Sequence, residues 1–430
     1  MKGMGKEVEI KVNRLTRVEG EGALYIKVSE EGVERVEVKI FEPTRFFEAF
    51  LRGRKWYEVP DITARVCGIC PIAYIMSSSR ALEKILGIKV PEEITILRKI
   101  IYLGEWIFSH VLHVVFMHAP DFLGLRSAFE LVEREPEIFR LALRIKKFSN
   151  KVMEVIGGRG IHPVSFRVGG LYRIIRKEEL TKLQRNINEI KTYAEKLLRW
   201  TLRLNIPNYG RDIEFISLRN GKEYPILEGR VVSNKGLNIS EDDFENYIDV
   251  EQTHYSNALR YRVKGRGPYV TGPIARFNNN YDLIRGEVRD IIEEFGYKAP
   301  LCNMFQSIIA RSAEIYHAVL EIDRLIQEYK EPSKPYIECN IKEGEAAAIT
   351  EAPRGILYHR YRTDRYGKVV EANLITPTAQ NLASMEEDLR HIGRELLILE
   401  FNKAKSLAEQ VIRNYDPCIS CSVHSIVIVR

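Results

Sequence analysis

Cysteine, tryptophan and glutamine are scarce in this sequence of 430 residues, and neither sign of charge prevails. Six cysteines are too few for a disulfide-stapled scaffold of this length. The 65 Lys and Arg outnumber the 59 Asp and Glu by only six, a net charge of +6, which excludes a polybasic arm and predicts no nucleic-acid partner. Scarce glutamine beside abundant Lys, Arg and Glu resembles the composition of proteins from thermophiles, a hypothesis that concerns the source alone.

The sequence also lacks a long apolar segment that is free of polar residues. The N-terminus has no apolar run of the kind found in signal peptides. The most apolar long stretch, residues 99–118, contains one glutamate and three histidines, so we predict a buried helix rather than a membrane span. These absences favour a cytoplasmic protein.

Hydrophobic periodicity divides the chain into a short β-rich part and a long helical part. Alternating apolar residues over 7–42 predict a small antiparallel sheet. Helical periodicity follows, interrupted by irregular stretches with strand-like runs at 207–275 and 333–378. We therefore predict a mainly α fold with small β subdomains (α+β): an N-terminal antiparallel β region at 1–58 and a helical core with β excursions at 59–430. The predicted helices are 92–118, 135–157, 178–204, 280–296, 304–330 and 380–413.

Four of the six cysteines form two C-x-x-C pairs, Cys67 with Cys70 and Cys418 with Cys421. Two such pairs supply four thiolates that can converge on metal ions. Three alternatives are a structural zinc site, a redox-active dithiol and a chance pairing of core cysteines. Zinc ribbons place their pairs about 15–20 residues apart, whereas these pairs lie near opposite ends of the chain, and no βαβ pattern surrounds either. Spacing therefore favours metal binding without naming the metal.

Five segments together resemble, in order, the motifs of one enzyme family. They are R-V-E-G at 17–20, R-V-C-G-I-C at 65–70, E-A-P-R-G at 351–355, N-L-I-T-P-T at 373–378 and D-P-C-I-S-C-S-V-H at 416–424. With them the sequence is similar to the large, catalytic subunit of nickel–iron hydrogenases. Within that family it looks most like the cytoplasmic branch, which includes the archaeal sulfhydrogenase alpha subunits. The resemblance implies the large-subunit fold, with a buried core of long helices.

The resemblance implies a nickel–iron centre held by the four cysteines. Cys67 and Cys418 would be terminal ligands of nickel, while Cys70 and Cys421 would bridge nickel to an iron that carries carbon monoxide and cyanide. The implied reaction is the reversible, heterolytic oxidation of dihydrogen, in which a residue must take the proton. Cys418 is the first candidate for that base, and Glu19 resembles the proton-gating glutamate of the family.

The same resemblance assigns residues to the surroundings of this centre. Arg354 would donate to a cyanide, since a guanidinium is always charged and offers several donors, and Asp416 would orient it. The Pro377 backbone and Thr378 would line the other cyanide. Taken alone, Arg354 and Glu19 could equally be surface charges, and Asp416 an aspartate of a helix cap or turn.

A second metal site near the C-terminus is also implied, for magnesium or a second iron. Its ligands would be the Glu48 carboxylate, the Leu374 carbonyl and the His424 ring, although Glu48 could locally be a helix-surface residue. In the family the chain is cut after this histidine once nickel is in place. We therefore expect a maturation endopeptidase that cuts after His424 and removes residues 425–430.

Some positions depart from the family pattern or stay open. Tyr74 stands where many members have histidine, and its ordinary pKa of about 10 makes proton transfer harder. Glu21 replaces the histidine that usually follows R-x-E-G. His110 and His113 resemble a helical segment of the family, and His162 resembles a loop that faces the partner's nearest iron–sulfur cluster. Lone histidines on apolar helices are, however, usually core residues.

No further cysteine set could hold an iron–sulfur cluster. Cys302 and Cys339 stand alone in apolar surroundings, and we predict buried, unreactive thiols. Electrons must then leave through another polypeptide. The resemblance implies that this is a small iron–sulfur subunit, with two further partners beyond it, a flavin- and NAD(P)-binding protein and another iron–sulfur subunit. No G-x-G-x-x-G loop indicates a nucleotide site in this chain. The alternatives are a non-catalytic subunit like the relative in respiratory Complex I, a lineage that lost the four cysteines, and a zinc-stapled scaffold.

Overall fold

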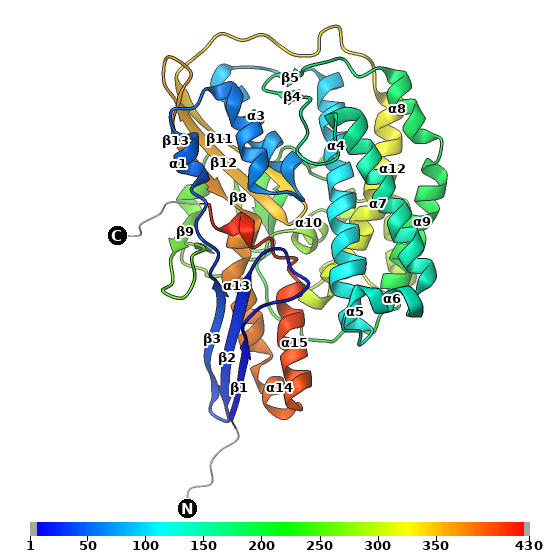
Figure 1. Cartoon of the computed structure of the whole chain (residues 1–430), viewed down its shortest axis with the longest axis vertical. Helices are drawn as coiled ribbons and strands as arrows, with labels where there is room; N and C mark the ends of the chain where they lie inside the picture. The colour runs from blue at the N-terminus through cyan, green and yellow to red at the C-terminus, as the bar shows by residue number, and fades with distance from the viewer. Residues whose placement is uncertain (1–6, 425–430) are drawn as a thin grey trace, which may run out of the picture.

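A computed structural model describes residues 7–424 of the chain. A bundle of helices gathers on one side of the molecule, and small antiparallel sheets with the helices that pack on them form the other side (Figure 1). This arrangement confirms the prediction of a mainly helical α+β fold. The principal helices of the bundle are α4 (Glu92–Val111), α7 (Pro136–Gly157), α9 (Ile187–Thr201) and α12 (Ser307–Glu328).

Helix α4 continues through a π-helical segment, Leu112–His118, into α5 (Ala119–Phe122). Among the described residues this rod, Glu92–Phe122, is the one helix long and apolar enough to cross a membrane, yet 78% of its most apolar window is buried inside the fold. A helix in the core of a globular protein can meet the same criteria of length and composition. The rod is thus the buried helix that the polar residues of 99–118 predict.

Three predicted helices are wrong in extent. The range 178–204 is two helices, α8 (Lys177–Gln184) and α9, because the chain leaves the helical conformation at Asn186. The range 280–296 contains only the short α11 (Gly286–Glu294) after a 3₁₀ turn. The range 380–413 begins earlier and breaks into α13 (Pro377–His391), α14 (Gly393–Ile398) and α15 (Phe401–Arg413). At Gly393 a Cβ would lie 2.1 Å from a methyl of Val33, so the chain turns where the N-terminal sheet packs against it.

The N-terminal sheet confirms the alternation over 7–42. Strands β1 (Glu7–Val12), β2 (Gly22–Ser29) and β3 (Gly32–Ile40) are antiparallel in the order β1-β2-β3. Register places Ile10, Ile26 and Val36 side by side, all buried, on the side packed against α13 and α14. One hydrophobic core joins this sheet to the helices, and the division at residue 58 stays a prediction.

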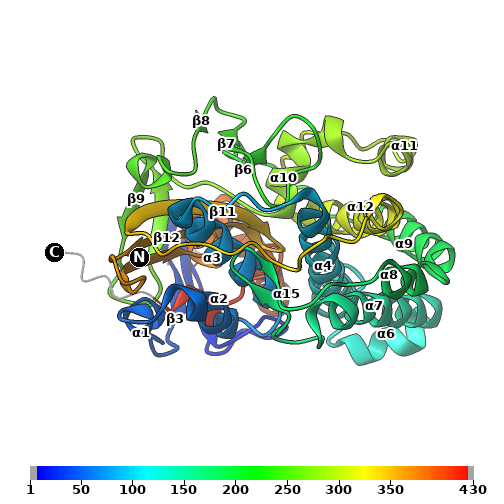
Figure 2. The ribbon, with the colours of Figure 1, turned by 90° about the horizontal axis from the view of Figure 1, so that it is seen from above.

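A second antiparallel sheet brings several of the sequence motifs together in space. It consists of β11 (Gly344–Ala352), β12 (Gly355–Thr363) and β13 (Val369–Ile375), and α3 (Pro71–Leu86) lies across β11 and β12 (Figure 2).

The remaining elements are α1 (Phe47–Leu51), α2 (Val59–Thr63), α6 (Ala128–Arg134), α10 (Pro273–Asn279), β4 (Phe166–Arg167), β5 (Gly170–Leu171), β6 (Ile216–Arg219), β7 (Arg230–Ser233), β8 (Asn238–Ile239), β9 (Ile248–Glu251) and β10 (Arg260–Val263).

Candidate metal centre

The first cysteine pair lies in the tight loop that leads into α3. Cys67 is extended, and Pro71 opens the helix, where its missing N–H leaves no bond unmade. The backbone N–H groups of Ile69 and Cys70 point at the Cys67 sulfur from 3.4 and 3.1 Å. Hydrogen bonds of this kind favour the charged form of an acid, so the loop stabilises a thiolate at Cys67.

A buried glutamate on α4 fixes the start of α3. Glu105 is fully buried, and its two carboxyl oxygens accept the N–H groups of Ile72 at 2.6 Å and Ala73 at 3.0 Å. Burial raises the pKa of Glu105 well above its usual range, although both hydrogen bonds lower it. These two hydrogen bonds are made just after Cys70. The role of Glu105 could not be predicted from the sequence, because the N–H groups that it binds belong to a different helix.

The second cysteine pair is fixed by contacts to two distant segments. Glu19 and Cys418 form a parallel backbone bridge. The Ile419 N–H donates to the Glu19 carbonyl at 2.9 Å, and the Glu19 N–H donates to the Pro417 carbonyl at 3.4 Å. The Cys418 N–H donates to Thr378 Oγ1 at 2.9 Å. The R-x-E-G segment and the start of α13 therefore lie beside Cys418, as the resemblance implies.

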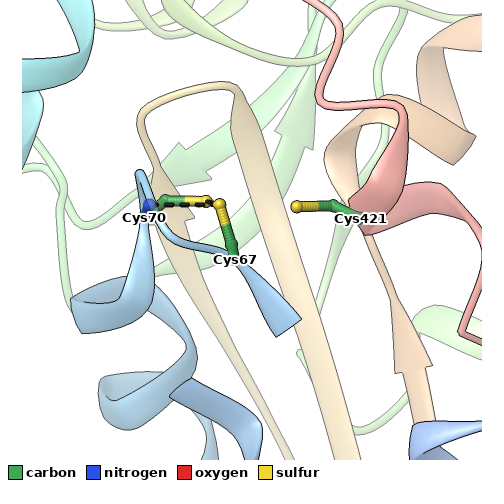
Figure 3. A group of neighbouring side chains, drawn as sticks. All are labelled: Cys67, Cys70 and Cys421. Carbon is green, nitrogen blue, oxygen red and sulfur yellow. Dashed lines mark hydrogen bonds between the residues drawn. The ribbon is translucent and has the colours of Figure 1, made fainter. Parts of the chain in front are cut away.

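Four buried sulfur atoms meet between these segments. The Cys67 Sγ lies 2.7 Å from the Cys70 Sγ and 3.7 Å from the Cys418 Sγ. Cys67, Cys70 and Cys421 have their sulfurs within 4.8 Å of one another, and Figure 3 shows the first two facing the third. The sulfurs of Cys418 and Cys421 are in direct contact, as in a disulfide. Four sulfurs at such spacing are a donor set that fits soft metal ions such as nickel.

The two thiols of the first pair differ in acidity. Burial opposes the ionisation of Cys67, but the hydrogen bond from the Cys70 thiol and the positive charge of Arg354 lower its pKa. The pKa of Cys70 is raised well above its usual value, because that hydrogen bond holds its proton and because it is buried. Cys67 therefore ionises first, and the guanidinium of Arg354 is the main positive charge acting on the pair.

Arg354 is buried and only partly hydrogen-bonded. Its Nε donates to the Asp416 carbonyl at 2.7 Å, and its Nη2 pairs with the Asp416 carboxylate at 3.0 Å. Within the described part of the chain its Nη1 has no hydrogen-bond partner. Buried donors are nearly always paired. An unpartnered guanidinium N–H beside a sulfur cluster fits an acceptor bound at that cluster.

Other contacts hold the R-x-E-G segment in place. Glu19 is half-buried, and its Oε2 accepts the Ser420 N–H at 3.2 Å. Arg17, at φ 57°, forms an ion pair with Asp121. Asp121 also pairs with Arg413 at the end of α15, at 2.7 Å. One carboxylate thus joins the segment before Glu19 to the segment before Cys418.

The residues of the expected second metal site also come together. The Leu374 N–H donates to the Glu48 carboxylate at 2.8 Å, and both residues are buried. The two ring nitrogens of His424 face carbonyl oxygens, Nε2 that of Leu374 at 2.6 Å and Nδ1 that of Cys421 at 2.8 Å. An imidazole nitrogen and a carbonyl oxygen can both ligate a metal cation, so a cation shared by Nε2 and the Leu374 carbonyl fits this arrangement. Pro377, the first residue of α13, is buried three residues further on.

The two departures from the family pattern have different surroundings. Tyr74 is buried, and its hydroxyl has no partner among residues 7–424. Burial, together with the charges of the first cysteine pair, raises its pKa well above the usual value. Its ring lies 5.6 Å from that of His359, a buried histidine that pairs with Leu374 across the sheet and that sequence reasoning missed. Glu21 is exposed and pairs with Arg14.

His110 of α4 and His113 of the π-helical segment that continues it link this long helix to neighbouring segments. His110 Nε2 lies 2.8 Å from the Glu314 carboxylate, and His113 Nε2 lies 2.7 Å from the Arg413 carbonyl. Both rings are buried, as core histidines would be. His162 is half-buried at φ 50°, next to the segment that leads into the first cysteine pair. Functional roles for these three histidines stay predictions.

The prediction for the two single cysteines is wrong. Cys302 is exposed and Cys339 is partly exposed. Both lie in loops, between α11 and α12 and between α12 and β11 respectively, and apolar neighbours in sequence do not bury a loop residue. Residues 425–430, which the expected cut would remove, lie outside the described residues.

A comparison with protein families decides the class. The family model of the nickel-dependent hydrogenases matches residues 45–137 and 233–424. The chain belongs to this family. The alpha subunit of sulfhydrogenase 1 from Pyrococcus furiosus is 33% identical over 421 residues, which cover 96% of this chain and 97% of that one. A vhu subunit of the F420-non-reducing hydrogenase from Methanocaldococcus jannaschii is 30% identical, covering 91% and 99%.

Solved structures confirm the large-subunit fold of nickel–iron hydrogenases. The NAD⁺-reducing [NiFe]-hydrogenase in its H2-reduced state matches with a TM-score of 0.89 at 24% identity, over 97% of this chain and 99% of that one. The family match and the similarity to curated hydrogenase subunits confirm the prediction of a catalytic, nickel-dependent hydrogenase subunit, so the protein is an oxidoreductase. The names of its relatives mark them as subunits of larger enzymes.

Proposed function

We propose that this hydrogenase subunit binds nickel and iron through its four cysteines and oxidises dihydrogen reversibly. The observation that carries the proposal is the meeting of four buried sulfur atoms from the two ends of the chain beside a buried arginine with an unpartnered N–H. When bound, the metals would supply a Lewis-acidic centre that polarises dihydrogen. Cys67 and Cys418 would be terminal ligands, and Cys70 and Cys421 would bridge the metals.

Heterolytic cleavage of dihydrogen gives a proton that the chain must accept and move. We assign this to the Cys418 sulfur first and to the Glu19 carboxylate second. The backbone bridge between these two residues, and the bond from Ser420 N–H to the Glu19 carboxylate, support the assignment. Glu19 is half-buried, so it can pass a proton from the interior toward solvent.

The surroundings of the centre would hold the ligands of iron. Arg354, oriented by Asp416, would donate its unpartnered N–H to one cyanide. The start of α13, with Pro377 and Thr378, would line the other cyanide, and the bond from Cys418 N–H to the Thr378 hydroxyl supports this. Carbon monoxide would complete the set.

A second metal, magnesium or iron, would be held by Glu48, Leu374 and His424. A carboxylate, a carbonyl and an imidazole suit such ions. The paired approach of both His424 nitrogens to carbonyl oxygens supports a cation there. An endopeptidase would cut after His424 during maturation.

Electrons would leave through a small iron–sulfur subunit, since the sequence has no further cysteine set. A flavin- and NAD(P)-binding protein and another iron–sulfur subunit would complete a cytoplasmic complex. One structural relative is described as an NAD⁺-reducing hydrogenase, and a further relative from Cupriavidus necator as NAD-reducing, which supports NAD(P) as the carrier. The composition supports a thermophilic source, and the similarity to a sulfhydrogenase supports sulfur reduction as a side activity.

Metal analysis of the purified protein, combined with hydrogen–deuterium exchange, tests the proposal. We expect nickel and iron in the chain, and exchange between D2 and water that disappears when the metals are removed. Zinc without nickel would instead indicate the zinc-stapled scaffold, and neither metal would indicate a non-catalytic subunit.

A further inference from the structure

Arg276 of α10 uses every N–H of its guanidinium inside the protein. Its Nε and Nη2 donate to the two carboxylate oxygens of Glu314 at 2.9 and 2.8 Å, and its Nη1 donates to Glu351 at 2.9 Å. The two remaining hydrogens go to carbonyl oxygens, those of Ala352 at 2.7 Å and Pro353 at 3.2 Å. An arginine has five such hydrogens in a rigid fork, so the site is fully satisfied at 0% exposure.

The two carbonyls stand directly before Arg354, that of Ala352 at the end of β11 and that of Pro353 in the turn that follows. Ala352 pairs with Gly355 at the end of the β11–β12 hairpin, so Pro353 and Arg354 alone form the turn. Pro353 has no backbone N–H, so its carbonyl oxygen is the backbone group through which neighbouring residues can hydrogen-bond to it. Arg276 therefore fixes the backbone immediately before Arg354.

The residues that precede α10 also contact the turn and the strand that follows it. Thr271 Oγ1 accepts the Ile356 N–H at 2.9 Å. Gly272 lies so close that a Cβ there would be 2.7 Å from the Arg354 carbonyl oxygen. The single segment 271–276 thus contacts backbone groups before, within and after the turn and leaves its backbone little freedom to shift.

A second layer of side chains holds Arg276 itself. The Glu314 carboxylate also accepts the Tyr224 hydroxyl at 2.7 Å and contacts His110 Nε2 at 2.8 Å. The Trp106 ring lies 4.2 Å from the guanidinium, and its indole N–H donates to the Glu351 carbonyl at 2.8 Å. Burying a cation between two carboxylates carries a large desolvation cost, and apolar packing is often at least as stable. Such a network is better explained by the geometry that it imposes than by stability.

We propose that Arg276 is a positioning residue for Arg354. By fixing the Ala352 and Pro353 carbonyls, it sets where the Arg354 guanidinium stands relative to the four sulfurs and to a ligand that they hold. The inference rests on the proposed function, in which Arg354 donates to a ligand of iron. A displacement of about 1 Å at such a donor can cost about a hundredfold in rate.

The variant Arg276→Lys tests this, because one ammonium cannot reach both carboxylates and both carbonyls. Arg260→Lys is the matched control. Arg260 is also buried, at 1% exposure, and forms two bonds of 2.7 and 2.6 Å to the Glu386 carboxylate under a tyrosine ring. Both of these bonds go to α13 and not to the turn. If Arg276→Lys does not fold, Glu314→Gln replaces it as the test variant, because this substitution weakens the hydrogen bonds of the same guanidinium more mildly.

In the assembled enzyme we expect Arg276→Lys to retain nickel and iron, to lose about 10- to 100-fold of the hydrogen–deuterium exchange, and to shift the infrared bands of the iron-bound cyanide. Arg260→Lys should leave the bands unchanged. Combined with Arg354→Lys, Arg276→Lys should add little further loss, since it acts through the same side chain. Losses that multiply in the double variant, or bands that match those of Arg260→Lys, would overturn the proposal.

Amide hydrogen exchange of the peptide that covers residues 352–356 separates this inference from the proposed function. If the wild type lacks nickel and activity, the proposed function has failed. The positioning claim is then supported by faster exchange of this peptide in Arg276→Lys than in Arg260→Lys, and equal exchange in the two variants overturns it.

Discussion

The sulfur atoms of Cys67 and Cys418 lie 3.7 Å apart, although 351 residues separate them in sequence. The first is fixed by the loop before α3 and the second by the bridge to Glu19 and the hydroxyl of Thr378. Each segment supplies only two of the four sulfur donors. The folding of the N-terminal third of the chain against its end is therefore what creates the donor set.

The first prediction concerns Cys418. Cys418→Ser should abolish most nickel binding and all dihydrogen cleavage, because it removes a soft ligand and the proposed base together. The loss should exceed the roughly 10- to 100-fold effect typical of residues that only support ligands. Elemental analysis of the purified variant checks this. Cys302→Ser, at an exposed cysteine, should keep full nickel, and full nickel in Cys418→Ser would contradict the assignment.

The second prediction concerns Glu19. Glu19→Gln keeps the backbone bridge and the carbonyl acceptor for the Ser420 N–H, but an amide cannot relay a proton. We expect normal metal content with turnover and hydrogen–deuterium exchange reduced by about 10²- to 10⁴-fold. Glu21→Gln, two residues away and exposed, should behave as wild type. Wild-type exchange in Glu19→Gln would remove Glu19 from the proton path.

The N-terminal sheet was predictable because one face is buried, and burial of one face produces alternation in the sequence. The helix boundaries within 380–413 were not predictable, because the break at Gly393 depends on the approach of Val33, which lies on another element. Helical periodicity indicates which face of a helix is apolar. It does not indicate where a neighbouring strand packs against the helix and ends it. Local periodicity therefore identifies the elements better than it identifies their ends.

The spacing of the cysteines already favoured a metal site, but it did not name the metal and left zinc open, so nickel and iron could be predicted only through the resemblance. The roles of Glu105 and Arg276 were not predicted, because the sequence of a helix does not identify the residues that a charged side chain in it contacts. Their partners lie on α3, on α12 and in the β11–β12 turn. Such contacts exist only in the folded chain, so they had to be found in the structure.

The third prediction concerns the second metal site. Glu48→Gln can still accept the Leu374 N–H through its amide oxygen, but it removes the negative charge from the site. We expect magnesium or iron affinity at this site to fall by about 10- to 100-fold while the nickel content stays unchanged. Titration of the metal-stripped protein with Mg²⁺ or Fe²⁺ measures this. An exposed substitution, Glu343→Gln, serves as control, and equal affinities in the two variants would argue against a metal at Glu48.

The fourth prediction concerns processing. The resemblance to the family leads us to expect that active enzyme ends at His424, whose ring nitrogens lie against carbonyl oxygens inside the fold. Intact mass spectrometry of the active complex should therefore show a chain without residues 425–430. Full-length chains with full nickel and full activity would rule the cut out as a requirement.

The last prediction concerns the pH dependence of stability through His317 on α12. This histidine is buried, and its Nδ1 accepts the Arg285 N–H at 3.2 Å, which requires an unprotonated nitrogen. Burial lowers its pKa to about 4; nearby Glu321 and Glu314 oppose this shift, while Arg285 and Arg324 favour it. The unfolded chain, with a pKa of about 6.5, therefore binds a proton between about pH 6.5 and pH 4 that the folded chain does not.

Stability must consequently fall as the pH is lowered through that window. For His317 alone we expect a loss of about 2 kcal/mol between pH 7 and pH 5. His317→Gln keeps a hydrogen-bond acceptor but cannot titrate, so its unfolding free energy in urea should fall less over the same interval. His254→Gln, at an exposed histidine, should retain the wild-type slope. If both variants show the wild-type slope, then His317 is protonated in the fold and the bond from the Arg285 N–H is not made at low pH.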